Sequence, residues 1–196
     1  MKAINETYEA MFNGLPINTN PINGLGCHAE ILVALQSIME SMRARHSRIF
    51  VTMLTIRLPD LYNGQVDFPA FLESFIRYER RHYGDVQYVW RVECNAGTVH
   101  PHWHVILVYD GNKTQSAWNH QLKAAEYWSN ALKADATGLV HVTQTQSQLS
   151  AGDGFMIRRG DMVTFQDCFQ FCSYIAKVGI NMLPENTRAF GSSMRL

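Results

Sequence analysis

The sequence predicts an α+β domain built on a ferredoxin-like (RRM-like) antiparallel sheet of about five strands, with helices packed on one face. Two observations support this prediction. Hydrophobic periodicity along the chain gives the element order β-α-β-β-α-β-α, which is the order of a split β-α-β arrangement. The turn signal Asn95-Ala96-Gly97-Thr98 joins the two middle strands as a hairpin. With 196 residues, 46% of them hydrophobic, the chain can bury one sizeable core and is expected to form one domain over residues 1–196.

Composition restricts the class of protein further. The formal net charge is zero, which argues against indiscriminate coating of nucleic acid but allows a local basic patch. No run of about 18 apolar residues predicts a membrane span, and the first six residues lack the apolar core of a signal peptide. The four cysteines show no Cys-x-x-Cys spacing and are expected to be reduced thiols of a cytoplasmic protein.

The first half of the chain predicts an arm, two helices and a strand. Residues 1–26 are rich in Asn, Gly and Pro and are expected to form an irregular arm. A helix follows because apolar residues from Ile31 to Met42 recur at helical spacing, and it ends in the basic residues Arg43 to His46. Residues 49–56 form a β-branched, buried strand. The next helix begins at a cap, Asp67, with Pro69 in its first turn, and ends at Gly84.

The second half supplies the remaining strands and two helices. Residues 86–94 and 102–109 form the hairpin strands, and a helix is expected from about 116 to 133. Residues 139–143 form a further strand. The last helix spans residues 164–178 and is closed by Gly179. The core therefore covers residues 47–180, between an N-terminal arm and helix (1–46) and a C-terminal tail (181–196).

The segment His100-Pro101-His102-Trp103-His104 predicts a metal site. Successive side chains on a strand alternate faces, so His102 and His104 lie on one face and Trp103 on the other. Glu93 lies on the neighbouring strand and shares their face in the registers that pair it with residue 100 or 102. Two histidines and a carboxylate suit Mn²⁺, and Mg²⁺ could also bind. His100 has the same parity and is either structural or an outer neighbour of the ligands.

The last helix predicts a nucleophile. On a helical wheel an apolar stripe runs through Phe165, Cys168 and Cys172, and Tyr174 points nearly opposite it with Lys177 as its i+3 neighbour. A phenol attacks phosphorus only as the phenolate, which a nearby cation favours, and Lys177 could neutralise charge on phosphoryl oxygens. Tyrosine and lysine at this spacing also occupy many solvated helix faces, so the pair is informative only together with the histidine strand.

These segments resemble motifs of the HUH endonucleases. His102-Trp103-His104-Val105-Ile106-Leu107 resembles their His-hydrophobic-His motif, although Trp103 is bulky for the middle position. Tyr174-Ile175-Ala176-Lys177 resembles their single-tyrosine Tyr-x-x-Lys motif, and Val51-Thr52-Met53-Leu54-Thr55 resembles their first motif. With Arg91-Val92-Glu93 and the 188–193 tail, the chain is most similar to filamentous-phage (inovirus) replication initiators, including prophage relatives of the YagK/YfjJ type.

The resemblance implies the HUH endonuclease fold and an enzyme that nicks and rejoins single-stranded DNA at a replication origin. Tyr174 would form a 5′-phosphotyrosine, Lys177 would assist, and Glu93, His102 and His104 would hold Mn²⁺ or Mg²⁺. Implied partners are origin DNA and the helicase and polymerase of a bacterial host, in whose cytoplasm the protein would act. Candidate phosphate contacts are surface arginines: Arg77, Arg80, Arg81, Arg158, Arg159, Arg188 and Arg195.

Three alternatives stay open from the sequence. The same chemistry serves plasmid mobilisation and transposition. A chain that kept the fold but lost activity would be a DNA-binding regulator. A third class is a small zinc-stabilised protein that uses the histidines with Cys168 and Cys172, although these cysteines lie on the apolar stripe of the last helix.

Overall fold

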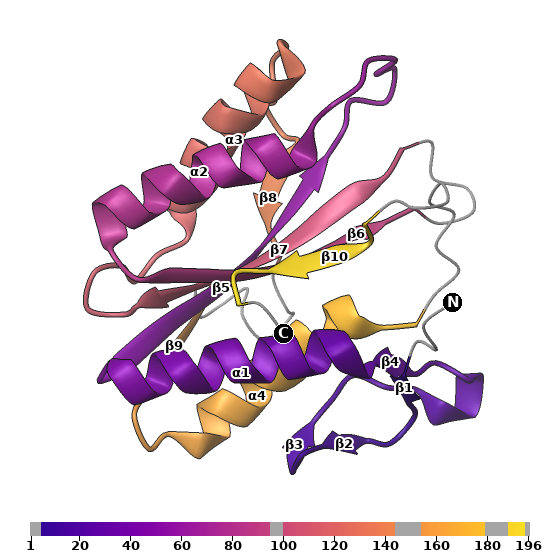
Figure 1. Ribbon diagram of the computed structural model, residues 1–196, viewed down its shortest axis with the longest axis vertical. Helices are drawn as coiled ribbons and strands as arrows, with labels where there is room; N and C mark the ends of the chain where they lie inside the picture. The colour runs from indigo at the N-terminus through magenta and orange to yellow at the C-terminus, as the bar shows by residue number, and fades with distance from the viewer. Residues whose placement is uncertain (1–4, 95–99, 144–153, 179–187, 195–196) are drawn as a thin grey trace.

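The fold has three layers, with the sheet between two pairs of helices (Figure 1). A computed structural model describes residues 5–94, 100–143, 154–178 and 188–194. The hairpin turn at 95–98, Gly179 and Arg195, all singled out in the sequence, lie outside the described residues. In the described part of the chain no helix is both long and apolar enough to cross a membrane.

Over the described residues the main sheet has six strands, and all of its pairings are antiparallel. Its order is β10-β6-β7-β5-β8, and β9 pairs with the first half of β5. The two longest strands, β5 and β7, are central and pair over nine residues from Ile49↔Asp110 to Arg57↔His102. The strands are β5 (Arg48–Arg57), β6 (Val86–Glu93), β7 (His102–Asp110), β8 (Val140–Val142), β9 (Phe155–Arg158) and β10 (Phe190–Ser192).

Helices α2 (Phe68–Tyr83) and α3 (Trp118–Leu132) cover one face of this sheet. Asp67 caps α2 as expected, because its carboxylate accepts a hydrogen bond from the Ala70 amide. Trp103 points into this layer, where its ring stacks on Phe68 at 4.8 Å between centroids and meets Trp128 edge-on. The bulky residue between the two histidines thus anchors β7 to the α2/α3 layer.

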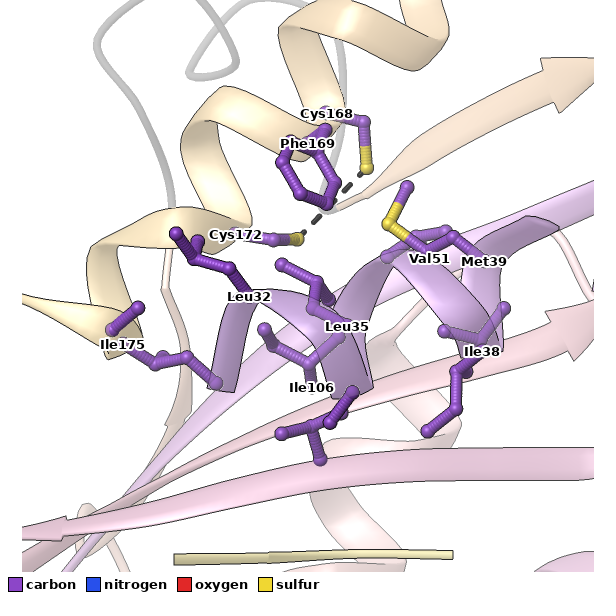
Figure 2. Close-up of a cluster of buried hydrophobic side chains, with 14 of the residues drawn as sticks. Leu32, Leu35, Ile38, Met39, Val51, Ile106, Cys168, Phe169, Cys172 and Ile175 are labelled. Carbon is purple, nitrogen blue, oxygen red and sulfur yellow. Dashed lines mark hydrogen bonds between the residues drawn. The ribbon is translucent and has the colours of Figure 1, made fainter. Parts of the chain in front are cut away.

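The other face is covered by α1 (Ala29–Arg45) and α4 (Met162–Cys172). Figure 2 shows their side chains meeting over the sheet, with Leu35 of α1 between Phe169 of α4 and Ile106 of β7. The expectation of helices on one face was therefore wrong. The reason lies in β7 itself, where Ile106 and Val108 are as fully buried as Val105 and Leu107. A strand apolar on both sides needs cover on both faces.

The N-terminal arm is more regular than expected. β1 (Glu6–Thr7) pairs with β4 (Cys27–His28), and β2 (Met11–Phe12) pairs with β3 (Leu15–Pro16). Asn13 and Gly14 join β2 to β3 with φ values of 49° and 78°, and positive φ at both positions is typical of a tight hairpin turn. A single 3₁₀ turn, η1 (Pro21–Asn23), follows. These pieces are too short for hydrophobic periodicity to predict them.

The last helix is shorter than expected. α4 ends at Cys172, and a 3₁₀ turn, η2 (Ser173–Ala176), carries the chain on from there. Tyr174 therefore does not sit on the α-helical wheel assumed from the sequence. η2 is held at its far end, where Lys177 bridges to Cys27 of β4 and the Val178 amide donates to the Gly26 carbonyl. The N-terminal segment thus braces the part of the chain that carries Tyr174.

Candidate active site

Glu93, His102 and His104 converge at one end of the β6/β7 hairpin. The register pairs Glu93 with His102 and Arg91 with His104, which is one of the two registers that put the carboxylate on the histidine face. Glu93 Oε2 lies 3.5 Å from His102 Nε2 and 3.7 Å from His104 Nε2. One ligand atom from each residue lies within 4.8 Å of the others. The strand alternation predicted this cluster correctly.

The buried ring of His104 fits a metal ligand. Its Nδ1 lies 3.0 Å from Thr55 Oγ1, and Thr55 Oγ1 lies 2.6 Å from Thr143 Oγ1. Its Nε2 is buried and has no hydrogen-bond partner in the described structure. An unpaired buried nitrogen is costly, and a cation at Nε2 would satisfy it. If Nδ1 donates to Thr55, the lone pair of Nε2 faces the carboxylate, as metal binding requires.

The carboxylate of Glu93 is kept ionised by its neighbours. Partial burial disfavours the charged form, but the imidazoles of His102 and His104, at 3.5 and 3.7 Å, and the charge of Arg91 outweigh burial and hold the pKa of Glu93 well below its usual range. Two imidazole nitrogens and one carboxylate oxygen form a mixed donor set with room for further ligands, which suits a divalent ion. The residues present therefore fit the divalent metal expected from the sequence.

Tyr174 lies against this cluster. Its ring meets the His104 ring edge-on at 5.6 Å between centroids, and Lys177 Nζ lies 4.9 Å from the centroid of the Tyr174 ring. Burial and the charge of Glu93 raise the pKa of Tyr174, while Arg91 opposes them. The phenol is half-buried and also packs against the α1/α4 core. The wheel argument placed Tyr174 away from all packing and was wrong there, but the residue does face the histidines.

Arg91 joins the tyrosine segment to the sheet. The residue is 4% exposed, and its Nη1 donates to the carbonyl oxygens of Ile175 at 2.7 Å and Lys177 at 2.5 Å. These carbonyls flank the end of η2, so one buried cation fixes the turn that carries Tyr174. Because Arg91 pairs with His104 in the sheet, the same residue ties the position of the tyrosine to the ligand strand.

A comparison with protein families identifies the family of this chain. The family model described as the YagK/YfjJ C-terminal domain matches residues 9–193, which is nearly the whole chain. The chain belongs to the YagK/YfjJ C-terminal domain family. A search of curated proteins finds no match. Among solved structures, the chain is similar to the N-terminal nuclease domain of non-structural protein 1 of minute virus of mice, which has a reported Zn²⁺ site.

The likeness to the viral domain is distant. The two chains share 11% identity, with 83% of this chain and 77% of the other covered, and the TM-score is 0.32. That score is below the level that indicates a common fold. The function of this YagK/YfjJ-family chain is therefore argued from its own side chains.

Sequence reasoning assigned no role in the site to four residues near the cluster, although two of them, Thr55 and Arg91, lie in segments that carried the motif resemblance. Thr55, Thr143, Arg91 and His141 lie around the cluster, and Thr55 pairs with His104 on one side and His141 on the other. Burial, with the nearby charges of Arg57, His104 and His102, lowers the pKa of His141. Parity offered a signal for Arg91, since it lies two residues before Glu93 on a strand and so shares its face. Thr143 could not be placed without knowing that β8 pairs with β5.

The other candidate residues lie apart from the cluster. His100 is held elsewhere, with Nε2 3.0 Å from the Asp60 carbonyl oxygen. Cys168 and Cys172 are buried in the α1/α4 core with their sulfurs 3.9 Å apart, and neither belongs to a group with metal-ligand geometry in the described residues (Figure 2). The arginines do not form one patch. Arg77, Arg80 and Arg81 are exposed on α2, Arg158 and Arg159 lie by the first residues of β5, and Arg188 precedes β10.

Proposed function

We propose that this chain is a metal-dependent endonuclease that nicks and rejoins single-stranded DNA with Tyr174 as its nucleophile. The observation that carries the proposal is the contact between the Tyr174 and His104 rings, because it puts a phenol beside a candidate metal site. Phosphodiester transfer needs both a nucleophile and a cation at the phosphate. The two arise from segments 70 residues apart in sequence and meet on one face of the sheet.

The reaction is a transesterification. The Tyr174 oxygen loses its proton to solvent and attacks the scissile phosphorus, so that a tyrosine–phosphate bond forms at the 5′ end. The bond to the 3′ oxygen breaks, and that oxygen takes up a proton to become a free 3′-hydroxyl. Glu93, His102 and His104 would hold a divalent ion, which would supply the positive charge that polarises the phosphate. Attack by the 3′-hydroxyl on the same phosphorus reverses the steps and reseals the strand.

The remaining residues prepare this step. Lys177 lies over the Tyr174 ring, where its charge favours the phenolate and can offset charge on phosphoryl oxygens. Arg91 holds η2 through two carbonyls, which limits the movement of the phenol relative to the ligands. Thr55 orients His104. Lys177 thus acts through its charge, and Arg91 and Thr55 act by holding Tyr174 and His104 in place, which is the kind of assistance that phosphoryl transfer requires.

The biological context is part of the proposal. We assign the fold to the HUH endonuclease type, which the strand order β6-β7-β5-β8 of a split β-α-β core supports. The motifs of an inovirus-type initiator favour rolling-circle replication at an origin, in the cytoplasm of a bacterial host, with host helicase and polymerase as partners. Plasmid mobilisation or transposition would use the same site on another DNA sequence.

Covalent capture tests the proposal. The protein is incubated with a randomised pool of single-stranded oligonucleotides and Mn²⁺, and SDS-resistant adducts are resolved by gel. Wild type is expected to form an adduct that EDTA abolishes, and Tyr174→Phe is expected to form none. Tyr127→Phe, on α3 across the sheet, is the matched control and should react as wild type. Absence of an adduct in wild type overturns the nuclease proposal, and an adduct in Tyr174→Phe overturns the choice of nucleophile.

A further inference from the structure

A groove with arginine walls lies on the opposite face of the sheet from the metal cluster. It has a volume of about 360 Å³ and lies between α2 and the β6/β10 edge. Arg77 and Arg80 of α2 line one wall, and Arg188, just before β10, lines the other. Apolar side chains, Leu72 and Ile76 of α2 and Trp90 of β6, form the remaining surface together with Tyr88. Figure 1 shows α2 lying above the face of the sheet on the side of β6 and β10.

Two of the three guanidinium groups are fixed by the backbone. Arg80 Nε donates to the Val86 carbonyl at 3.1 Å, and Arg188 Nε donates to the Phe190 carbonyl at 2.9 Å. An arginine held through Nε presents its two terminal nitrogens in a set direction, and the planar pair matches two phosphate oxygens. Arg77 instead pairs with Glu73 at 3.1 Å, and Glu73 is the one acidic residue among the described residues that line the groove. The groove is therefore cationic and partly preorganised.

Arg188 also connects the groove to the candidate active site. The Val92 amide donates to the Ala189 carbonyl at 2.9 Å, so the next residue on each strand, Glu93 and Arg188, lie level at the sheet edge. Phe190 pairs with Arg91, two residues along each strand from Arg188 and Glu93. A strand of DNA that leaves the metal cluster beside Glu93 would meet Arg188 first and then the groove.

We infer that this groove binds the single-stranded DNA that flanks the scissile phosphate. Its chemistry fits that ligand because guanidinium groups pair with phosphates and an apolar floor accepts an unstacked base. Duplex DNA would hide its bases from the floor, and an acidic peptide would leave it uncovered. The choice of DNA rests on the proposed function, whereas the existence of an anion-binding groove does not.

Metal-free binding tests this inference separately from catalysis. The probe is a fluorescein-labelled 20-nucleotide single strand of mixed sequence, and its anisotropy is followed in EDTA. Arg80→Gln/Arg188→Gln is expected to bind about tenfold or more weakly than wild type, with the slope of log affinity against log salt reduced by about 2. Arg158→Gln/Arg159→Gln carries the same charge change beside the other end of β5 and is expected to stay within about twofold. Circular dichroism melts check that both double variants fold.

Competition experiments and the covalent assay separate the outcomes. If both double variants lose affinity equally, binding is a general charge effect and the groove assignment is overturned. If poly-glutamate or duplex DNA displaces the probe as well as unlabelled single strand does, single-stranded DNA is the wrong ligand. Tyr174→Phe should bind as wild type in EDTA. If wild type forms no covalent adduct but the Arg80→Gln/Arg188→Gln variant binds the probe more weakly, the proposed function is wrong and the groove assignment stands. If wild type forms the adduct but the double variant binds the probe as tightly as wild type, the groove assignment is wrong and the proposed function stands.

Discussion

Thr55 Oγ1 lies 3.0 Å from His104 Nδ1, on the strand directly beside the histidine. Thr55 is 3% exposed, and its hydroxyl lies 2.6 Å from Thr143 Oγ1, so a chain of two hydroxyls sets the orientation of a buried imidazole. Such outer partners of metal-binding histidines fix both the tautomer and the direction of the ligating nitrogen. Thr55 is therefore expected to affect metal affinity, although it contacts His104 Nδ1 and not the candidate ligating atom Nε2.

Thr55→Val removes this hydroxyl at nearly constant volume. Metal affinity, measured by calorimetric titration with Mn²⁺, is expected to fall about tenfold to hundredfold, because His104 loses the partner of Nδ1. Thr55→Ser should retain most of the affinity. Thr52→Val makes the same change on β5 toward the α2/α3 layer and should leave the titration unchanged. Equal affinities for Thr55→Val and wild type would show that the hydroxyl has no such role.

Removal of a ligand should act more strongly than removal of its support. His104→Ala is expected to abolish measurable Mn²⁺ binding, because it deletes one of the three candidate ligands that the described residues supply. His100→Ala is a matched control, because His100 precedes the same strand but bonds to the Asp60 carbonyl. A titration of the two variants beside wild type decides the point. Loss of binding in both would mean that His100 belongs to the site.

The contrast between Glu93 and Tyr174 shows how far the sequence could predict this site. Strand parity depends on a period of two, so Glu93 and His104 could be put on one face without coordinates. The predicted direction of the Tyr174 side chain depended on where the last helix ends, and α4 ends at Cys172, two residues before Tyr174. Cover on the second sheet face was indicated by the unbroken apolar run from Val105 to Val108, but the prediction of helices on one face did not use it. Local periodicity predicts faces well and helix ends poorly.

Arg91 offers a test of positioning. Arg91→Lys keeps the charge but cannot donate to Ile175 and Lys177 as the guanidinium does, and Arg91→Gln loses the charge as well. Both are expected to slow adduct formation about tenfold or more, because misplacement of a nucleophile by an ångström is costly. Mn²⁺ affinity should change little. Arg48→Gln, at the first residue of β5, is the control. If both variants react at the wild-type rate in single-turnover assays, Arg91 does not position Tyr174.

A buried polar triad should dominate the stability of the α2/α3 layer. Glu79 Oε2 lies 2.7 Å from His120 Nδ1 and accepts a hydrogen bond from Tyr109 at 3.0 Å, and both members of the pair Glu79 and His120 are fully buried. Glu79→Gln is expected to lower the free energy of unfolding by about 3–5 kcal/mol, because breaking a buried pair leaves the partner unsatisfied. Urea denaturation measures it. Glu73→Gln, on the exposed side of α2, should be nearly neutral, and equal effects would contradict the prediction.

Cys27 should make folding stability fall at alkaline pH. The thiol is fully buried beneath the Lys177 bridge, and burial raises its pKa from 9.0 to about 11, although Lys177 and Arg91 oppose the shift. Below pH 9 both the folded and the unfolded thiol are protonated, so the stabilising effect of the raised pKa is complete. Between pH 9 and about 11 only the unfolded chain ionises. Stability is then lost, on the order of 2–3 kcal/mol over the window.

Replacement of this thiol should flatten the alkaline limb. Cys27→Ala is expected to be less stable than wild type at pH 8, because it leaves a small cavity, and the difference should shrink by pH 10.5, where only wild type carries the ionisation penalty. Urea denaturation at both pH values measures the gap. Cys94→Ala, at a half-exposed position beside Glu93, should show the same gap at both. Parallel stability curves for Cys27→Ala and wild type would mean that the buried thiol does not ionise on unfolding in this range, and the alkaline loss would then belong to another group.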